Sequence, residues 1–189
     1  MSIEKIIAIS GPSGTGKTTI VKTLLKNFPV FAFSISATTR PIRSDETDGS
    51  DYYFLSIEEF KSKIRNNELL EYQEVYPDLF YGTLKSEISR MWDENKIPLL
   101  DIDVFGALNV KKEFGDKCLI IFIHPGSIDT LKKRLIHRGS ETDNSFTIRI
   151  AKSEAELNEA HNFDDIVYND KHPDDAIYEV ARIVEEFIS

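Results

Sequence analysis

Short, nearly continuous apolar runs recur along most of the chain. They are residues 5–10 (KIIAIS), 97–103 (IPLLDID) and 118–125 (CLIIFIHP), with 164–170 (DDIVYND) as a further candidate. Runs of this length with few interrupting polar residues are typical of parallel strands that are covered on both faces. The pattern therefore predicts a buried, mostly parallel sheet.

Amphipathic segments with helical spacing separate these runs. They are residues 18–28 (TTIVKTLLKNF), 127–138 (SIDTLKKRLIHR), a stretch from 146 to about 162, and 173–187 (PDDAIYEVARIVEEF). Ser127 suits the N-cap of the second helix, and a proline opens the last one, where its missing N–H costs nothing. Strands that alternate with helices predict an α/β fold with a mostly parallel sheet flanked by helices.

Two segments interrupt the alternation. Residues 34 to about 95 are richer in Tyr, Thr and turn formers, and they contain a strand-like piece at 51–56 and a helix-like piece at 56–68. Ser56 and Glu59 have the spacing of a capping box there. We expect an inserted α+β subdomain. Residues 138–146 (RGSETDNSF) are polar and predict a mobile flap. The core would then comprise residues 1–33, 96–137 and 147–189.

The formal net charge of -9 argues against broad binding to nucleic acids or membranes, because both favour a basic face. Cys118 is the single cysteine, so no disulfide can form within the chain. The N-terminus is too short and charged for a signal peptide, and no apolar run approaches membrane-spanning length. We therefore expect a cytoplasmic protein. A homo-oligomer is compatible with the sequence, but nothing in it supports one.

One local motif carries chemistry by itself. The segment GPSGTGKT matches G-x-x-x-x-G-K-[ST], follows a predicted strand and opens a predicted helix, so a chance Gly-rich turn is the weaker reading. Such a loop cradles the phosphates of a nucleoside triphosphate at a helix N-terminus. Its lysine reaches the β and γ phosphates, and its last hydroxyl can bind Mg²⁺. The residues are Gly11, Pro12, Ser13, Gly14, Thr15, Gly16, Lys17 and Thr18. The chain has no N-K-x-D motif, which disfavours a GTPase.

Phosphoryl transfer also needs positive charge around the equatorial oxygens. Arg40 and Arg43 lie in the insert among several acids, Arg134 and Arg138 are four residues apart on one helix, and Arg149 follows the flap. A single arginine is usually a solvated surface residue. Their placement beside the two irregular segments favours a ligand site. The acids near the first two arginines would serve as partners while the anion site is empty.

Several spaced motifs occur in a fixed order: SGPSGTGKTT, FSISATTRPIR, DGSDYYF, NNELLEY, YGT, LLDIDVFGALNVK, LKKRLIHRGSET and IVYND. On these motifs, and along nearly its whole length, the chain resembles the guanylate kinases, part of the nucleoside monophosphate kinase group of P-loop kinases. The resemblance implies transfer of the γ-phosphoryl group of ATP to GMP, and to dGMP more weakly, giving ADP and GDP with Mg²⁺. It also implies that the insert binds GMP and that the flap is a lid.

The resemblance assigns residues to the GMP site. Arg40 and Arg43 would grip the GMP phosphate, and Glu71 would accept hydrogen bonds from the guanine N1–H and amino group. The remaining contacts would come from Ser36, Tyr52, Tyr81, Thr83, Asp101 and Asp103. Asp101 and Asp103 would serve either the base or the waters of Mg²⁺. Without the resemblance, Glu71 reads as an exposed acid at a helix end, and the tyrosines read as core.

The resemblance also assigns catalytic residues and the donor site. Catalysis would rest on Lys17, Arg40, Arg134, Arg138 and Arg149, with Asn169 near the adenine of ATP and Thr18 on the metal. No general base is needed, because the second pKa of a phosphate is near 6 and the acceptor is already a dianion at neutral pH.

The sequence departs from the family pattern at three places, and two rival interpretations remain. The family pattern T-T-R-x-P-R-x-G-E has Ile42 in place of a proline and Asp45 in place of a glycine here, and the turn before YGT reads YPDLF. One rival is a guanylate-kinase-like scaffold domain that binds peptides, but such domains have degraded phosphate loops. The other is a P-loop kinase for another acceptor, such as a ribose phosphate. Glu71, Tyr81 and Thr83 together favour guanine.

Overall fold

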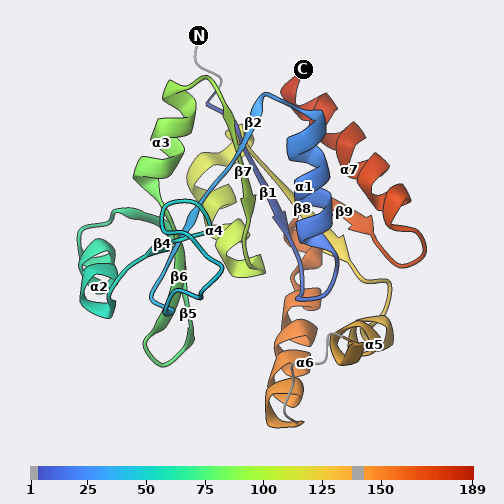
Figure 1. The fold of residues 1–189 in the computed structure, drawn as a ribbon. Coiled ribbons are helices and arrows are strands. Elements are labelled where there is room, and N and C mark those ends of the chain that lie inside the picture. The colour runs from blue at the N-terminus through green and yellow to red at the C-terminus, as the bar shows by residue number, and fades with distance from the viewer. Residues whose placement is uncertain (1–3, 138–142) are drawn as a thin grey trace.

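The computed structural model describes residues 4–137 and 143–189. Within them the central sheet has five strands, all parallel, in the order β2-β7-β1-β8-β9 (Figure 1). Their bounds are β1 Ile6–Ser10, β2 Phe31–Phe33, β7 Ile97–Asp101, β8 Cys118–His124 and β9 Asp165–Tyr168. The predicted α/β fold with a mostly parallel sheet is confirmed. In this sheet, predicted ligands lie at the carboxyl ends of β1, β7 and β9. These ends meet at one edge of a parallel sheet.

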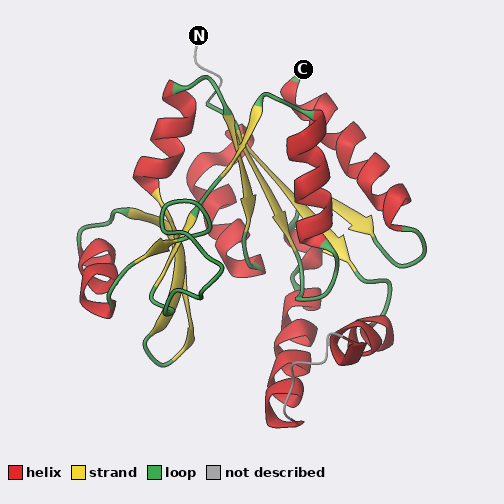
Figure 2. Cartoon of the chain, viewed as in Figure 1, coloured by secondary structure: helices red, strands yellow, loops and turns green. Residues whose placement is uncertain are grey.

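Helices cover both faces of this sheet, which explains its continuous apolar strands (Figure 2). Ile7 and Ile9 of β1 pack with α1 (Lys17–Asn27) and α7 (Pro173–Ile188). Their neighbours Ile6 and Ala8 face the other way, into a second cluster with α3 (Lys85–Asp93) and α4 (Val104–Phe114). Because successive side chains of a strand point to opposite faces, both sets must be apolar.

A second, mixed sheet is formed by the insert. Its strand order is β4-β3-β6-β5, with bounds β3 Ser36–Thr38, β4 Tyr53–Phe54, β5 Leu69–Tyr76 and β6 Leu79–Leu84. Helix α2 (Ile57–Arg65) packs Phe60 against this sheet in a small separate core. The predicted capping box is confirmed: Ser56 Oγ accepts from Glu59 N at 3.2 Å, and Ser56 N donates to Glu59 Oε2 at 2.8 Å.

In the C-terminal half, the bounds of one helix differ from the prediction. Helix α5 spans Ile128–His137, and its predicted N-cap is present, because Ser127 Oγ accepts from Thr130 N at 3.1 Å. Helix α6 spans Asp143–Asn158, so it starts earlier than predicted and includes the last residues of the expected flap. The other residues of that flap, 138–142, lie outside the described residues. Helix α6 also ends earlier than predicted, at Asn158, and the last residues of the predicted stretch, Ala160–Asn162, form a separate short 3-10 turn.

Across the described residues, the structure has no helix with both the length and the apolar character needed to cross a bilayer.

Candidate active site

The phosphate loop joins β1 to α1 at the carboxyl edge of the central sheet. Gly11, Gly14 and Gly16 have φ angles of 134°, 92° and 93°, a region that side chains rarely adopt. A Cβ on Gly11 would also lie 2.5 Å from the carbonyl oxygen of Ile123. The loop conformation therefore requires glycine. It borders a cavity of about 160 Å³ with Lys17, Thr18 and Asp101 in its wall.

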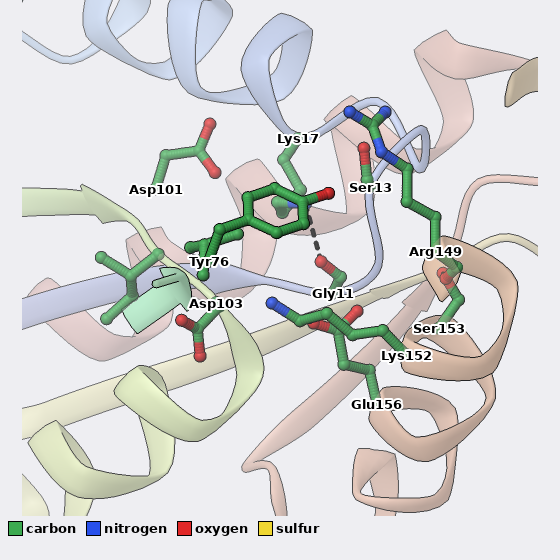
Figure 3. Close-up of a pocket in the computed structure, with 12 residues that line it drawn as sticks. Gly11, Ser13, Lys17, Tyr76, Asp101, Asp103, Arg149, Lys152, Ser153 and Glu156 are labelled. Carbon is green, nitrogen blue, oxygen red and sulfur yellow. Dashed lines mark hydrogen bonds and ion pairs between the residues drawn. The ribbon is translucent and has the colours of Figure 1, made fainter. Parts of the chain in front are cut away.

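Two loop side chains are held in place at this cavity. Lys17 Nζ donates to the carbonyl oxygens of Gly11, at 2.7 Å, and Pro12, at 3.0 Å (Figure 3). Thr18 Oγ1 donates to Asp101 Oδ2 at 3.3 Å, so the end of β7 faces the loop. Burial raises the pKa of Asp101, although the charge of Lys17 opposes the shift. The structure thus brings together a cation, a hydroxyl and a carboxylate where phosphates would bind.

A larger cavity of about 370 Å³ extends from the loop toward β5 and α6. Figure 3 shows Arg149, Lys152, Ser153 and Glu156 of α6 opposite Asp101 and the loop. The sequence analysis missed Lys152, whose Nζ donates to Gln73 Oε1 of β5 at 3.0 Å. Its position three residues after Arg149 on one helix could have identified it, because such residues share a helix face. Arg138 lies outside the described residues.

Strand register assembles a second group of predicted residues. Ser36 of β3 pairs with Thr83 of β6, and Thr83 pairs with Glu71 of β5. The three residues therefore form one row across three strands, with Thr83 Oγ1 donating to Glu71 Oε1 at 2.7 Å. A cavity of about 250 Å³ lies beside this row, and Tyr52, Tyr81, Asp101 and Asp103 also line it.

Glu71 is buried in a strand, so its reading as an exposed helix-end acid is wrong. Only 6% of its surface is exposed. Burial raises the pKa of Glu71 to about 7; the hydrogen bond from Thr83 opposes the shift and nearby Asp103 adds to it. Such a carboxylate needs hydrogen-bond donors to ionise fully.

The structure distinguishes the contacts of Asp101 from those of Asp103, to which the sequence assigned the same two alternative roles. Asp101 faces Thr18, whereas Asp103 caps α4 by accepting from Gly106 N at 3.0 Å. Asp103 also lies close enough to Glu71 to raise its pKa. Asp101 is therefore on the side of the phosphate loop, and Asp103 is beside the buried glutamate.

Arg40 is held by an acid of its own loop. Its guanidinium donates to both carboxylate oxygens of Glu46, at 3.0 and 2.6 Å, and the backbone N–H of Arg43 donates to the same carboxylate at 2.9 Å. Arg40 also lies over the ring of Tyr52, 5.5 Å from its centroid. A carboxylate in such a fork occupies the geometry that a phosphate would take. Asp45 is not among the described non-glycine residues with positive φ, so this loop does not need the family's glycine.

A fourth cavity, of about 620 Å³, lies on the other side of the loop, between α1, α5 and α7. Arg134 and Asn169 both line it, and an Arg134 guanidinium N–H donates to the Asn169 carbonyl oxygen at 2.8 Å. The Asn169 amide donates to the carbonyl oxygen of Thr15 at 2.8 Å. Its buried Oδ1 accepts no hydrogen bond within the part of the chain that the structure describes.

The assembled features are a glycine phosphate loop, a buried carboxylate in a neighbouring sheet and arginines between them. The family model described as guanylate kinase matches residues 3–187. The chain belongs to the guanylate kinase family. The resemblance drawn from the sequence motifs is thus confirmed.

Individual guanylate kinases agree with this assignment. That of Salinibacter ruber is 48% identical over the full length of both chains, and that of Porphyromonas gingivalis is 45% identical over 99% of this chain and all of its own. A crystal structure of guanylate kinase from Anaplasma phagocytophilum matches with a TM-score of 0.72 at 28% identity, covering 100% of this chain and 86% of that one. The fold is therefore that of a P-loop kinase.

Proposed function

We propose that this chain transfers the γ-phosphoryl group of ATP to GMP, giving ADP and GDP. The observation that carries the proposal is the buried Glu71, held by Thr83 in the cavity next to an intact phosphate loop. Guanine presents an N1–H and an amino group side by side, and one carboxylate can accept from both. Adenine has no matching pair of donors, so the pocket favours GMP over AMP.

The donor nucleotide would bind across the phosphate loop. Lys17 and the loop N–H groups would hold its phosphates, and the cavity beside Asn169 would hold its base. Asn169 lines this cavity, and its Oδ1 has no hydrogen-bond partner in the described residues. Because that oxygen is buried, the side chain would have to turn toward the cavity to accept from the exocyclic amino group of adenine.

The acceptor phosphate would take the place of the Glu46 carboxylate. Arg40 already presents a bidentate fork there, and Tyr52 and Tyr81 line the cavity beside it. Arg43, exposed in the same loop, would close on the phosphate from the other side. The exchange would keep the arginine charge compensated in both states, which limits the cost of desolvating it.

The residues at the loop fit Mg²⁺. Thr18 Oγ1 and Asp101 Oδ2 are hard oxygen ligands only 3.3 Å apart. The described residues contain no group of three or more His, Cys, Asp or Glu that could hold a metal, so nucleotide oxygens and water would complete the coordination. When bound, Mg²⁺ would neutralise charge on the transferring phosphoryl group.

The proposal extends to the division of labour along the chain. Residues 34–95 would bind GMP, residues 138–146 would form the lid, and the remainder would hold ATP. Arg134, Arg138 and Arg149 would supply charge at the transferring group once the lid closes. The expected setting is cytoplasmic recycling of GMP in purine metabolism, with dGMP as a weaker acceptor.

A coupled assay with ATP, Mg²⁺ and each of GMP, AMP, UMP and CMP tests the proposal. We expect turnover with GMP at least about a hundredfold more efficient than with AMP, because adenine lacks the pair of donors that the Glu71 carboxylate would accept from guanine. A preference for another monophosphate would favour the rival kinase reading. Absence of turnover with all four at millimolar levels would favour the scaffold reading.

The pH dependence of GMP binding gives a second test. Burial raises the pKa of Glu71 to about 7, and guanine needs the ionised form, so GMP binding should release a proton. We expect the KM for GMP to rise as pH falls below 7, approaching about tenfold per unit. Protonation of the GMP phosphate also contributes near pH 6, so the Glu71→Gln variant is the control. In this variant, the rise of the KM caused by protonation of the GMP phosphate should remain, and the rise caused by Glu71 should disappear. Identical pH profiles for the wild type and the variant would contradict the role of Glu71.

Gly106 offers a sharper test of the same pocket. A Cβ there would lie 2.7 Å from Glu71 Oε2, so Gly106→Ala should displace the carboxylate. Because alanine favours helices, part of the cost of this displacement is offset, and the variant should still fold. We expect the KM for GMP to rise about tenfold with the KM for ATP unchanged, since small displacements in a site cost much. The exposed Asn109→Ala on the same helix is the control, and equal kinetics for the two variants would contradict the prediction.

A further inference from the structure

The chain crosses between its two sheets at two places. Residues 34–35 join β2 to β3, and α3 joins β6 back to β7 (Figure 1). Any change in the angle between the two sheets must be absorbed at these connections. Glu87 lies on α3 and is buried, with 3% of its surface exposed. It does not line the cavities described above.

The Glu87 carboxylate contacts both connections and a strand of the second sheet. Oε1 accepts from the backbone N–H of Ile35 at 3.5 Å, and Oε2 accepts from the Tyr53 hydroxyl at 3.0 Å. Arg90, one turn along α3, donates to both oxygens at 2.8 and 3.0 Å. A single side chain thus joins the first connection, the second connection and β4.

The charge of this carboxylate is stabilised in place. Burial opposes its ionisation, but the hydrogen bonds from Arg90 and Tyr53 outweigh burial and hold the pKa of Glu87 below its usual value. Hydrogen bonds to an ionised acceptor are stronger and more directional than neutral ones. The hydrogen bonds that join Glu87 to Arg90 and Tyr53 are therefore charge-assisted, whereas the contact with the Ile35 N–H, at 3.5 Å, is longer.

The two groups held by Glu87 are each next to a predicted GMP contact. Ile35 immediately precedes Ser36, and Tyr53 immediately follows Tyr52. Ser36 and Tyr52 line the cavity with Glu71. The carboxylate thus holds the chain neighbours of two residues that line the acceptor pocket, although Glu87 itself does not line that pocket.

We infer that Glu87 is a positioning residue, which holds the GMP-binding sheet at its working angle through Ile35 and Tyr53. The inference rests on the proposed function, because it concerns the acceptor site alone. Loosening the link leaves the phosphate loop and the Asn169 cavity intact. A weaker link should therefore raise the KM for GMP and leave the KM for ATP unchanged.

The decisive variant is Tyr53→Phe, which removes one hydroxyl and keeps the ring in the small core. We expect the KM for GMP to rise about fivefold with the KM for ATP unchanged, as loss of a hydrogen bond to a charged group would produce. Glu87→Gln should raise it further, because it weakens the link to Arg90 and Ile35 as well. Glu94→Gln is the control: it breaks only the exposed ion pair of Arg90 with Glu94, at 2.7 Å, and should leave both constants unchanged.

The possible results separate this inference from the proposed function. A wild-type chain that does not phosphorylate GMP overturns both. If the wild type is active, a lower melting temperature for Tyr53→Phe with an unchanged KM for GMP overturns the inference alone, as does an equal rise in both KM values. If Glu87→Gln does not fold, Tyr53→Phe decides the question.

Discussion

Replacing Lys17 with methionine is expected to lower kcat at least about a thousandfold, the scale on which a cation at a transferring phosphoryl group contributes. Methionine keeps the length of the side chain and removes its charge. Lys17 now donates to the carbonyl oxygens of Gly11 and Pro12, at 2.7 and 3.0 Å. These bonds orient the amine along the loop, so a bound triphosphate would meet it without rearrangement of the backbone.

The measurement is single-turnover transfer from ATP to GMP, together with the affinity for ATP. Lys22→Met is the control, because Lys22 lies on the same helix and is exposed. It should retain wild-type rates. A Lys17→Met variant that keeps a tenth of the wild-type rate would show that the loop lysine does not stabilise the transferring group.

Replacing Glu71 with glutamine is expected to lower kcat/KM for GMP about a thousandfold, because a site built to hydrogen-bond a base rejects a mismatched partner strongly. One carboxylate oxygen would become an amide N–H₂ that faces the donors of guanine. Burial of Glu71 makes the mismatch costly, because a buried polar group that loses its partner is poorly compensated by solvent. The ratio of GMP to AMP turnover should fall as well.

The assay is the monophosphate panel run on this variant and on Glu58→Gln, a matched change at an exposed glutamate of α2. The Glu58 variant should behave as wild type. If Glu71→Gln retains the wild-type preference for GMP, base selection resides elsewhere and the assignment of the pocket is wrong.

The central sheet was predictable because its strands are buried on both faces. Residues 5–10, 97–103 and 118–125 carry a nearly continuous apolar signal that full burial explains, whereas β9, predicted at 164–170, is an edge strand of which only Val167 is buried. Strand β2 was not predicted: its three residues end a short apolar run, 28–33 (FPVFAF), that begins at the end of the predicted first helix. Helix α4 was also missed: Gly106 weakens its helical pattern, and the reason for that glycine is the contact with Glu71.

In the candidate site, too, some residues could be predicted from the sequence and others could not. The phosphate loop is local, so its glycines, lysine and threonine could be read directly from eight consecutive residues. The row of Ser36, Thr83 and Glu71 depends on the register of three strands far apart in the chain, and only the family resemblance pointed to it. The spacing of Lys152 from Arg149 indicates that they share a helix face, but the contact of Lys152 with Gln73 depends on how α6 packs against β5, which periodicity does not specify.

The acidic residues near Arg40 and Arg43 illustrate a prediction that rests on charge alone. The sequence analysis expected them to compensate an empty anion site, and Glu46 does so for Arg40 at 2.6 Å. Which acid would do so could not be predicted, because it depends on the turn in which Glu46 N donates to the carbonyl oxygen of Arg43, at 3.2 Å.

The most direct test of the account follows the phosphoryl group itself. The protein is incubated with GMP, Mg²⁺ and ATP that carries a radioactive γ-phosphate, and the products are separated. We predict that the label appears in the β-phosphate of GDP, with little released as inorganic phosphate, because Glu71, Arg40 and the loop hold acceptor and donor together. Label found only in inorganic phosphate, or retained in ATP, would contradict the assignment of this chain as an ATP:GMP phosphotransferase.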